Sequence, residues 1–403
     1  MIKKNTSAFD ILVKSALITL VIGLFFSNAL KSIGLVVLAL RSVFLVKRKK
    51  DIILSIKHPL VLSTICIVII YCVSAMLSSN KLYAWISIKN KLAIVFAIIA
   101  IMQCKFDKNE IKYFLFVIIM CALLQSIYAS YFYFNIDEWN NMYHVGNVLP
   151  TIKIHHVQIG VLIAITILIL YHFILKEKNK IHKIAMLIAG IFLFIFLHIF
   201  AVRTGIVLLY FMLLFYTIYK CIIEKKWKYI VGIITVLSIS SISALQFSDT
   251  LKSKLEYMKY DISQFRMNSE NMHEYSDARR LLSIKNGIEI WKNNWYLGCG
   301  IGDIYDECKK INQIKNPSVN EDLYYLPHSQ YLYFYSVFGI ILGSIVILCF
   351  IFPAFYFIYK KNNLFSSIYV ALLIFSIWDA YFGTLFGVCI YTVVIAIGSK
   401  KTI

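Results

Sequence analysis

The sequence predicts an all-α, polytopic membrane protein with about twelve transmembrane helices. Of its 403 residues, 60% are hydrophobic and only 15% are charged, and apolar runs long enough to span a bilayer recur along the whole chain. A chain of this size cannot hide so much apolar surface in a water-soluble core. The predicted segments are 9–29, 32–46, 59–78, 84–103, 113–133, 157–175, 184–201, 204–223, 229–247, 331–352, 364–382 and 383–399.

The basic residues predict the orientation of these segments. Eighteen lysines and arginines lie in five alternate connections, against four on the opposite side outside one long loop. Because lysine and arginine near helix ends are retained in the cytoplasm, we expect both chain ends on the cytoplasmic side. No small-residue cleavage site follows the first segment, so we expect a retained helix and not a secretory signal.

The formal net charge of +20 does not indicate a nucleic-acid partner. The long external loop, 248–327, holds eleven basic and twelve acidic residues, so the excess charge belongs to the membrane-anchoring connections. The predicted organisation is therefore helices one to nine in 1–247, the external loop in 248–327, and helices ten to twelve in 328–403.

The long loop carries a predicted amphipathic helix at about 277–293, with Ser276 and Asp277 as possible N-caps. A loop of this length is usually functional. A second external segment, 133–156, is aromatic and is expected at the membrane interface. The predicted inner face of the loop helix has apolar residues at helical spacing, namely Leu281, Ile284, Ile288 and Trp291.

Arg203 is the clearest candidate for a binding residue. It stands in HIFAVRTGIVLLY, between two apolar stretches, on the predicted external side. Ionisable groups at membrane depth are costly and tend to be retained for a task. The side chain either extends to the headgroups or presents paired donors to a phosphate group, because a guanidinium matches that geometry and stays charged.

Arg279 and Arg280 open the predicted loop helix. Neighbouring helical residues are about 100° apart, so we expect one of the pair on the inner face. Arg280 stands four residues before Ile284, which favours an inward position, with Arg279 pointing away as the lesser candidate. A solvated helix start is the alternative. An inward Arg280 would meet the same anion as Arg203.

His328, in LPHSQYL, stands at the start of the tenth apolar segment. Its ordinary pKa near 6.5 suits an imidazole to accept a proton at neutral pH, and neighbouring arginines would depress that pKa and favour the neutral form. A single interfacial histidine is more often structural. Together with two arginines on the same side of the membrane, His328 is a candidate general base.

Other polar groups give weaker signals. GCGIG at 298–302 lacks the preceding buried strand of a dinucleotide fold, so we expect a tight turn that lets backbone approach a ligand. His155 and His156 stand at the start of the sixth segment. They either line a cavity or anchor the helix at the membrane interface. Asp379 is expected at the external rim, without a specific role. Five acidic residues either bind a divalent cation or form solvated surface, and these are Asp303, Asp306, Glu307, Glu321 and Asp322.

Two cysteines fall in the external loop. Cys299 and Cys308 would be able to form a disulfide in an oxidising compartment, but a spacing of nine residues leaves free thiols equally open.

At these residues the chain resembles the O-antigen ligase family, which also resembles the O-antigen polymerases. The similarity is carried by Arg203 in VRTG after a hydrophobic helix, by the late external loop, by Arg280 with Gly287 seven residues later and then WYLGCGIGD, and by His328 in HSQYL. It covers the predicted topology from end to end, and residue motifs from about 200 to 340. The sequence departs from the family at Ser329, where asparagine is common.

This resemblance implies a GT-C-like glycosyltransferase in the bacterial inner membrane. Such an enzyme takes a glycan from undecaprenyl diphosphate at the periplasmic face and attaches it to a lipid A core sugar, without metal, nucleotide or other cofactor. Arg203 and Arg280, with Arg279 as a lesser candidate, would bind the donor diphosphate, and His328 would deprotonate the acceptor hydroxyl. Direct displacement at the anomeric carbon would invert its configuration.

Two alternatives stay open from the sequence. A polymerase would use the same chemistry with a second lipid-linked glycan as acceptor. A transporter would also have many helices and intramembrane charge, but it predicts repeated halves with broken helices near the midplane, and the sequence contains no internal repeat. Membrane lipids are the other expected partners, and the sequence does not predict an oligomeric state.

Overall fold

The computed structural model describes residues 8–44, 49–133, 154–225, 227–247, 249–267, 275–315 and 326–400, which are helical and contain no strand. In chain order, the helices that coincide with predicted apolar segments are α1 (Ala8–Phe26), α2 (Asn28–Phe44), α4 (Pro59–Leu77), α5 (Lys81–Gln103), α6 (Lys108–Tyr133), α8 (His156–Ile174), α9 (Lys180–Ile199), α10 (Arg203–Glu224), α11 (Lys228–Phe247), α15 (Gln330–Tyr359), α16 (Asn363–Phe375) and α17 (Leu385–Gly398).

The protein is a polytopic, all-helical membrane protein. Eight of the described helices are long and apolar enough to cross a bilayer, namely α1, α4, α5, α6, α8, α9, α10 and α15. Three shorter apolar stretches lie in α11, α16 and α17. A helix therefore occupies each predicted segment, but a count of twelve spans is not confirmed, because some of these helices are short.

The eleventh predicted segment, 364–382, is too long. Helix α16 ends at Phe375, and a 3-10 turn, η3 (Tyr381–Gly383), precedes α17. Asp379 therefore lies in a break between two helices. The predicted boundary after residue 382 falls late in this break, because the residues around Asp379 are apolar and aromatic, so hydropathy alone continued the segment.

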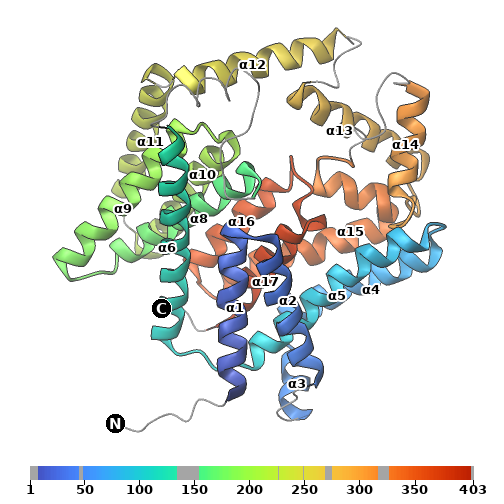
Figure 1. Cartoon of the computed structure of the whole chain (residues 1–403), viewed down its shortest axis with the longest axis horizontal. Helices are drawn as coiled ribbons and strands as arrows, with labels where there is room; N and C mark the ends of the chain where they lie inside the picture. The colour runs from blue at the N-terminus through green and yellow to red at the C-terminus, as the bar shows by residue number, and fades with distance from the viewer. Residues whose placement is uncertain are drawn as a thin grey trace.

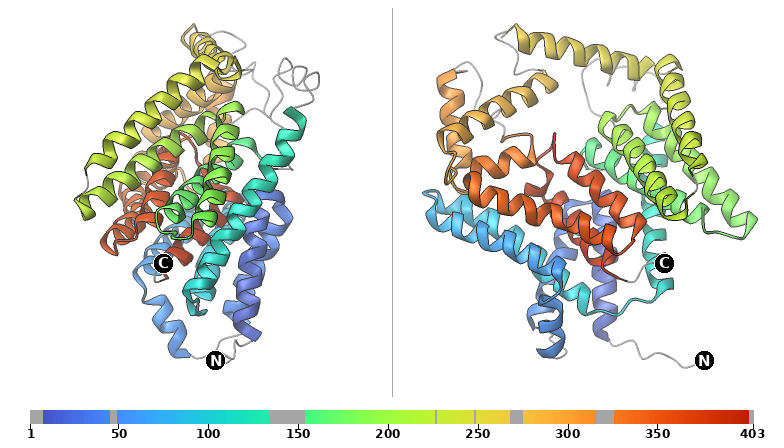
Figure 2. Two further views of the ribbon diagram at one scale, coloured as in Figure 1. Left: turned by 90° about the vertical axis from the view of Figure 1, so that its left-hand side faces the viewer. Right: turned by 180° about the vertical axis from the view of Figure 1, so that it is seen from behind.

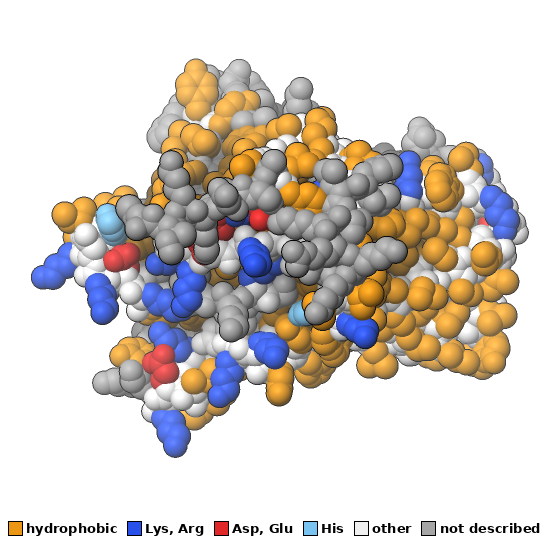
Figure 3. Space-filling model, turned by 90° about the horizontal axis from the view of Figure 1, so that it is seen from below, with side chains coloured by type: hydrophobic (Ala, Val, Ile, Leu, Met, Phe, Trp, Pro, Cys, Tyr) orange, Lys and Arg blue, Asp and Glu red, His pale blue; other side chains and the backbone are white. Residues whose placement is uncertain are grey.

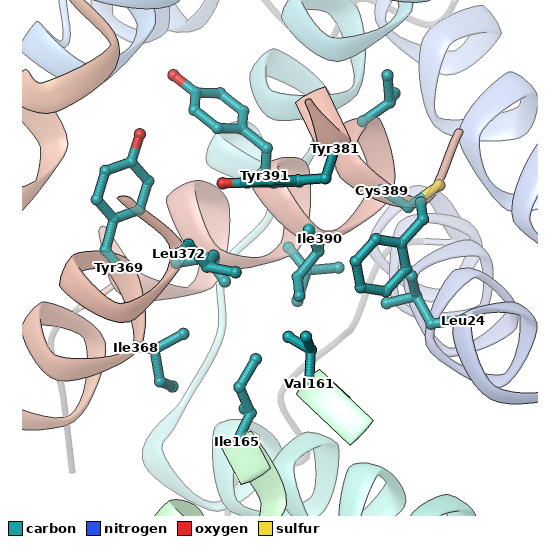
Figure 4. Close-up of a cluster of buried hydrophobic side chains, with 14 of the residues drawn as sticks. Leu24, Val161, Ile165, Ile368, Tyr369, Leu372, Tyr381, Cys389, Ile390 and Tyr391 are labelled. Atoms are coloured by element: carbon teal, nitrogen blue, oxygen red, sulfur yellow. The ribbon is translucent and has the colours of Figure 1, made fainter. Parts of the chain in front are cut away.

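Side chains from distant helices form the apolar core. Figure 4 shows Leu24, Val161, Ile165, Ile368 and Ile390 pointing toward one another from α1, α8, α16 and α17. Lipid is as apolar as leucine, so close packing and internal hydrogen bonds hold such helices together. Two buried tyrosine hydroxyls supply such bonds, Tyr369 to the carbonyl of Phe350 at 2.6 Å and Tyr391 to the Thr64 hydroxyl at 3.1 Å.

Contacts between helix ends define two ends of the bundle. At one end Lys400 donates to the carbonyls of Met102 and Cys104, and Tyr356 bonds His58. We call it the terminal end, because the described chain ends lie there. Seen from below Figure 1, lysine and arginine side chains gather on the left part of the surface, while the right part is largely hydrophobic (Figure 3).

Three further helices lie near the other end of the bundle, which we call the site end. They are α12 (Asp249–Arg266), α13 (Ser276–Asn293) and α14 (Ile304–Lys315). Both views in Figure 2 place α12 and α13 away from the N-terminus. The predicted loop helix at 277–293 is confirmed as α13. The short helix α3 (Lys49–Ile56) lies between α2 and α4. Most of the predicted interfacial segment 133–156 lies outside the described residues.

The segment GCGIG forms the predicted tight turn, and its backbone packs closely against other parts of the protein. Gly298 and Gly300 have positive φ values of 76° and 94°. A Cβ added at Gly298 would lie 2.2 Å from the carbonyl oxygen of Val337 in α15. The turn therefore joins the loop region tightly to α15, at a kink where Gly339 leaves helical geometry.

Candidate active site

The structure brings Arg203 and Arg280 to a single carboxylate. Arg203 is the first residue of α10, and its two terminal nitrogens donate to the two oxygens of Asp277 at 2.9 and 3.2 Å. Arg280, one turn further along α13, places Nη1 3.6 Å from Oδ1 of the same Asp277. We call these three residues the arginine cluster. Each of the three side chains is at least partly shielded from solvent, and Asp277 is 16% exposed.

His328 is held against α13 by backbone contacts. Its N–H donates to the Ser283 hydroxyl at 3.2 Å, and two turns later the Ser336 hydroxyl donates to the carbonyl of Gly287 at 3.0 Å. A Cβ on Gly287 would meet Pro327 at 2.9 Å, so only glycine permits this approach without a shift. The start of α15 is therefore fixed on the helix that carries Arg280.

The His328 imidazole lies within electrostatic reach of the arginines. Burial, together with Arg280 and then Arg279, lowers its pKa to about 4. The side chain is consequently neutral at pH 7. A neutral imidazole beside guanidinium groups is able to accept a proton once a negatively charged ligand offsets them.

Arg280 also acts electrostatically on residues without an assigned role, including His155 and Asp379. Burial lowers the pKa of His155, and Arg280 lowers it further. Burial raises the pKa of Asp379 to about 6, and Arg280 opposes that rise. His155 precedes α8 and Asp379 lies in the break after α16, so two more helix ends approach the arginine cluster.

That Arg279 is the lesser candidate stays a prediction, and its charge lowers the pKa of His328 less than that of Arg280 does. Residues at i, i+4 and i+7 share a helix face, and Arg279 is followed at these spacings by the buried Ser283 and Asn286. The buried face of α13 also includes Ala278, Leu282, Gly287 and Ile290, whereas Ile288 is exposed. The predicted apolar face was wrong because small and polar residues, not only large apolar ones, make the contact with α15 and α14.

Ser276 and Asp277 are not N-caps. The N-cap of α13 is Tyr275, which makes no side-chain capping bond, and Asp277 instead binds the two arginines. Two residues of α12 were also not anticipated from the sequence. Asp261 accepts the backbone N–H of Asp277 at 3.0 Å, and Lys254 donates to the carbonyls of Phe200 and Ala201, just before Arg203. Burial and then Arg203 lower the pKa of Lys254 to about 8.

Four helices begin around these residues without a hydrogen bond from their own N-cap side chain. They are α8, α10, α13 and α15, whose N-caps are His155, Val202, Tyr275 and Ser329. The first N–H groups of a helix carry partial positive charge and favour anions. Together with the basic side chains, these helix starts make the region suited to an anion.

The arrangement supports anion binding next to proton transfer. The site holds four basic side chains, those of Arg203, Lys254, Arg279 and Arg280. The carboxylates described near them are those of Asp261, Asp277 and Asp379. Burial raises the pKa of Asp261, as of Asp379, so these two are weaker counter-charges than an ordinary carboxylate. Paired arginines match the geometry of phosphate oxygens, and positioned positive charge stabilises a leaving anion.

The acidic residues of the loop do not form a metal site in the described part of the chain. No group of three or more His, Cys, Asp and Glu side chains there is arranged to hold a metal ion. Asp303 is not solvated surface either, because its carboxylate accepts the N–H groups of Ser79 and Asn80 at 2.8 and 2.7 Å. Glu321 and Asp322 lie outside the described residues.

Cys299 and Cys308 are free thiols in the structure. Burial raises the pKa of both, and that of Cys308 reaches about 12. Neither thiol is therefore a ready nucleophile.

The candidate site lies in a region that matches a known family. A search of curated proteins found no match, but a family model described as O-Antigen ligase matches residues 155–347. The match begins at His155 and includes Arg203, Arg279, Arg280 and His328, so the matched region holds the starts of α8, α10, α13 and α15 and the arginine cluster. The resemblance seen in the sequence motifs is confirmed, because residues 155–347 of this multi-pass membrane protein match the O-antigen ligase family.

Proposed function

We propose that the protein is a ligase that transfers a glycan from undecaprenyl diphosphate to a lipid A core sugar. It would act at the periplasmic face of the bacterial inner membrane, with both chain ends in the cytoplasm. The observation that carries this proposal is the convergence of Arg203 and Arg280 on one carboxylate, close to a neutral histidine, within the region that matches the family.

In this proposal the donor diphosphate takes the place of Asp277. A lipid diphosphate that bears a sugar carries two negative charges, whereas Asp277 supplies one. Arg203 would offer its paired donors to one phosphate and Arg280 would bind the other. Charge on the diphosphate increases as the glycosidic bond breaks, so these contacts strengthen toward the transition state, which is the condition for catalysis.

His328 would supply the second part of the chemistry. Its imidazole takes the proton of the acceptor hydroxyl, whose oxygen forms a bond to the anomeric carbon, while the bond to the diphosphate oxygen breaks and its electron pair leaves with the diphosphate. A pKa of about 4 would make His328 a weak base in the free protein. The bound diphosphate raises that pKa by opposing the arginines, so the base strengthens when the donor is present. A single displacement of this kind inverts the anomeric configuration.

The test is transfer by the purified full-length protein in liposomes, with an undecaprenyl-diphosphate-linked glycan and lipid A core as the offered acceptor. The proposal expects glycan on the core sugar, with the anomeric configuration inverted. Elongated glycan on the carrier lipid, with the core unmodified, would contradict the ligase and identify a polymerase. Uptake of substrate without any glycan product would exclude both.

A further inference from the structure

Helix α12 contacts both elements that carry the paired arginines. Figure 1 shows it lying across the top of the molecule, between α11 and α13. Its residues Lys254 and Asp261 are seven apart, so they lie on one face of the helix, about 10 Å from each other along the axis. Lys254 contacts the turn before α10, and Asp261 contacts the start of α13.

Lys254 fixes the turn that precedes Arg203. Its ammonium group donates to the carbonyl oxygens of Phe200 at 3.1 Å and Ala201 at 3.3 Å. The last carbonyls of a helix have no intrahelical partner and carry partial negative charge, which a lysine satisfies. Ala201 has φ of 48°, a left-handed conformation that costs energy for a residue with a side chain. The lysine therefore stabilises a strained turn two residues before Arg203.

Asp261 fixes the start of α13. Its Oδ2 accepts the N–H of Asp277 at 3.0 Å, and the residue is 7% exposed. A carboxylate at the first turn of a helix satisfies one of its unpaired N–H groups and interacts favourably with the helix dipole. Next to it, Tyr260 and Tyr275 make an edge-to-face contact with ring centroids 5.4 Å apart. The position of Asp277, and hence of Arg280 one turn later, depends on the hydrogen bond to Asp261.

We propose that Lys254 and Asp261 are positioning residues, and that α12 sets the separation between Arg203 and Arg280. This inference rests on the proposed function, because the separation matters only if both arginines bind one diphosphate. Arginine binds phosphate oxygens through a fixed fork, so a displacement of about 1 Å is enough to lose much of the rate. Arg203 and Asp277 are 74 residues apart in sequence, and α12 gives their two helices a common support besides their own ion pair.

The test compares variants of α12 in the full-length protein in liposomes. Lys254→Met and Asp261→Asn are expected to lower kcat/KM for an undecaprenyl-diphosphate-linked donor by about tenfold or more. Lys254→Arg, which keeps a charged donor, restores part of the loss. The matched controls are Lys259→Met and Glu256→Gln, which remove one basic and one acidic side chain from exposed positions of the same helix. Both controls are expected to act like the wild type.

A double-mutant cycle separates positioning from general destabilisation. If Lys254 acts through Arg203, adding Lys254→Met to Arg203→Ala lowers kcat/KM little further. Fully additive losses would overturn the inference, and so would unchanged kcat/KM in both Lys254→Met and Asp261→Asn. If either variant does not fold, Lys254→Arg and the remaining variant complete the comparison. The proposed function fails separately, through undiminished transfer by Arg203→Ala itself.

Discussion

The two ends of the helix bundle differ in the partners that they give to buried cations. At the terminal end Lys400 donates to two backbone carbonyls, and Lys14 forms an ion pair with Glu110. Helices α4, α9 and α16 begin there with capping bonds from His58, Asn179 and Asn362. At the site end two arginines share one carboxylate, and four helices begin without a capping bond from their own N-cap residue.

This difference distinguishes cations that support the fold from cations that bind a ligand. The terminal cations bond to groups of the protein itself and hold helices together. Among the described residues at the site end, basic side chains outnumber carboxylates, which favours an external anion. The terminal end therefore serves as an internal control for the site end. Substitutions at the site end should change transfer more than folding, and those at the terminal end should do the reverse.

The largest effect is expected for His328→Ala. Loss of a general base lowers kcat by about 10²- to 10⁴-fold, while the backbone bond from residue 328 to Ser283 remains possible. The matched control is His182→Ala, an exposed histidine near the start of α9 at the terminal end, which should transfer normally. Single-turnover transfer with verified membrane insertion checks both. Undiminished transfer by His328→Ala removes the proposed base.

Arg203→Lys is expected to give the next largest effect, a loss of about 10²-fold in kcat/KM. Lysine keeps the positive charge but loses the fork that now meets both oxygens of Asp277. Lys400→Met is the control from the terminal end, and it should lower the melting temperature while leaving KM for the donor unchanged. Normal turnover by Arg203→Lys would show that paired donors are not used.

Asp277→Asn should give a moderate effect of opposite sign on binding. Removing the carboxylate leaves both arginines without their shared counter-charge, so affinity for undecaprenyl diphosphate is expected to rise by about tenfold, equivalent to about 1.4 kcal/mol. A competition assay against the donor measures this change. Weaker binding by Asp277→Asn would mean that the carboxylate orders the arginines and does not compete with the diphosphate.

The smallest expected effect is a pH shift in Arg279→Gln. Arg279 contributes to lowering the pKa of His328, so its removal raises that pKa, and the neutral base is lost at a higher pH as the solution is acidified. The acid limb of kcat/KM, which reports the free enzyme, should therefore move to higher pH than in the wild type. An acid limb that stays in place would separate Arg279 from His328.

Much of the fold and part of the site follow from the sequence in physical terms. Hydropathy located a helix in each predicted segment, and Arg203 stood out because a charge between apolar stretches needs a reason. The loop helix was recognised from its spacing. The buried face of this helix was not recognised, because Ser283, Asn286 and Gly287 are polar or small. Apolar periodicity cannot identify contacts made by such residues.

The convergence of distant residues could not be read from the chain. Asp277 looks like an ordinary N-cap in the sequence, and its bonds to Arg203 depend on how α13 lies relative to α10. Lys254 and Asp261 gave no signal, because charged residues on an external helix are usually solvated. Their spacing of seven gains meaning only once both partners of α12 are in view.

The most direct test measures binding of undecaprenyl diphosphate and undecaprenyl monophosphate to the full-length protein, its Arg203→Ala and Arg280→Ala variants, and the double variant. If the two arginines hold one diphosphate, the wild type binds the diphosphate more tightly than the monophosphate, and each single variant loses most of that preference. The double variant then loses little more. A preference for the diphosphate that persists in the double variant would contradict the account.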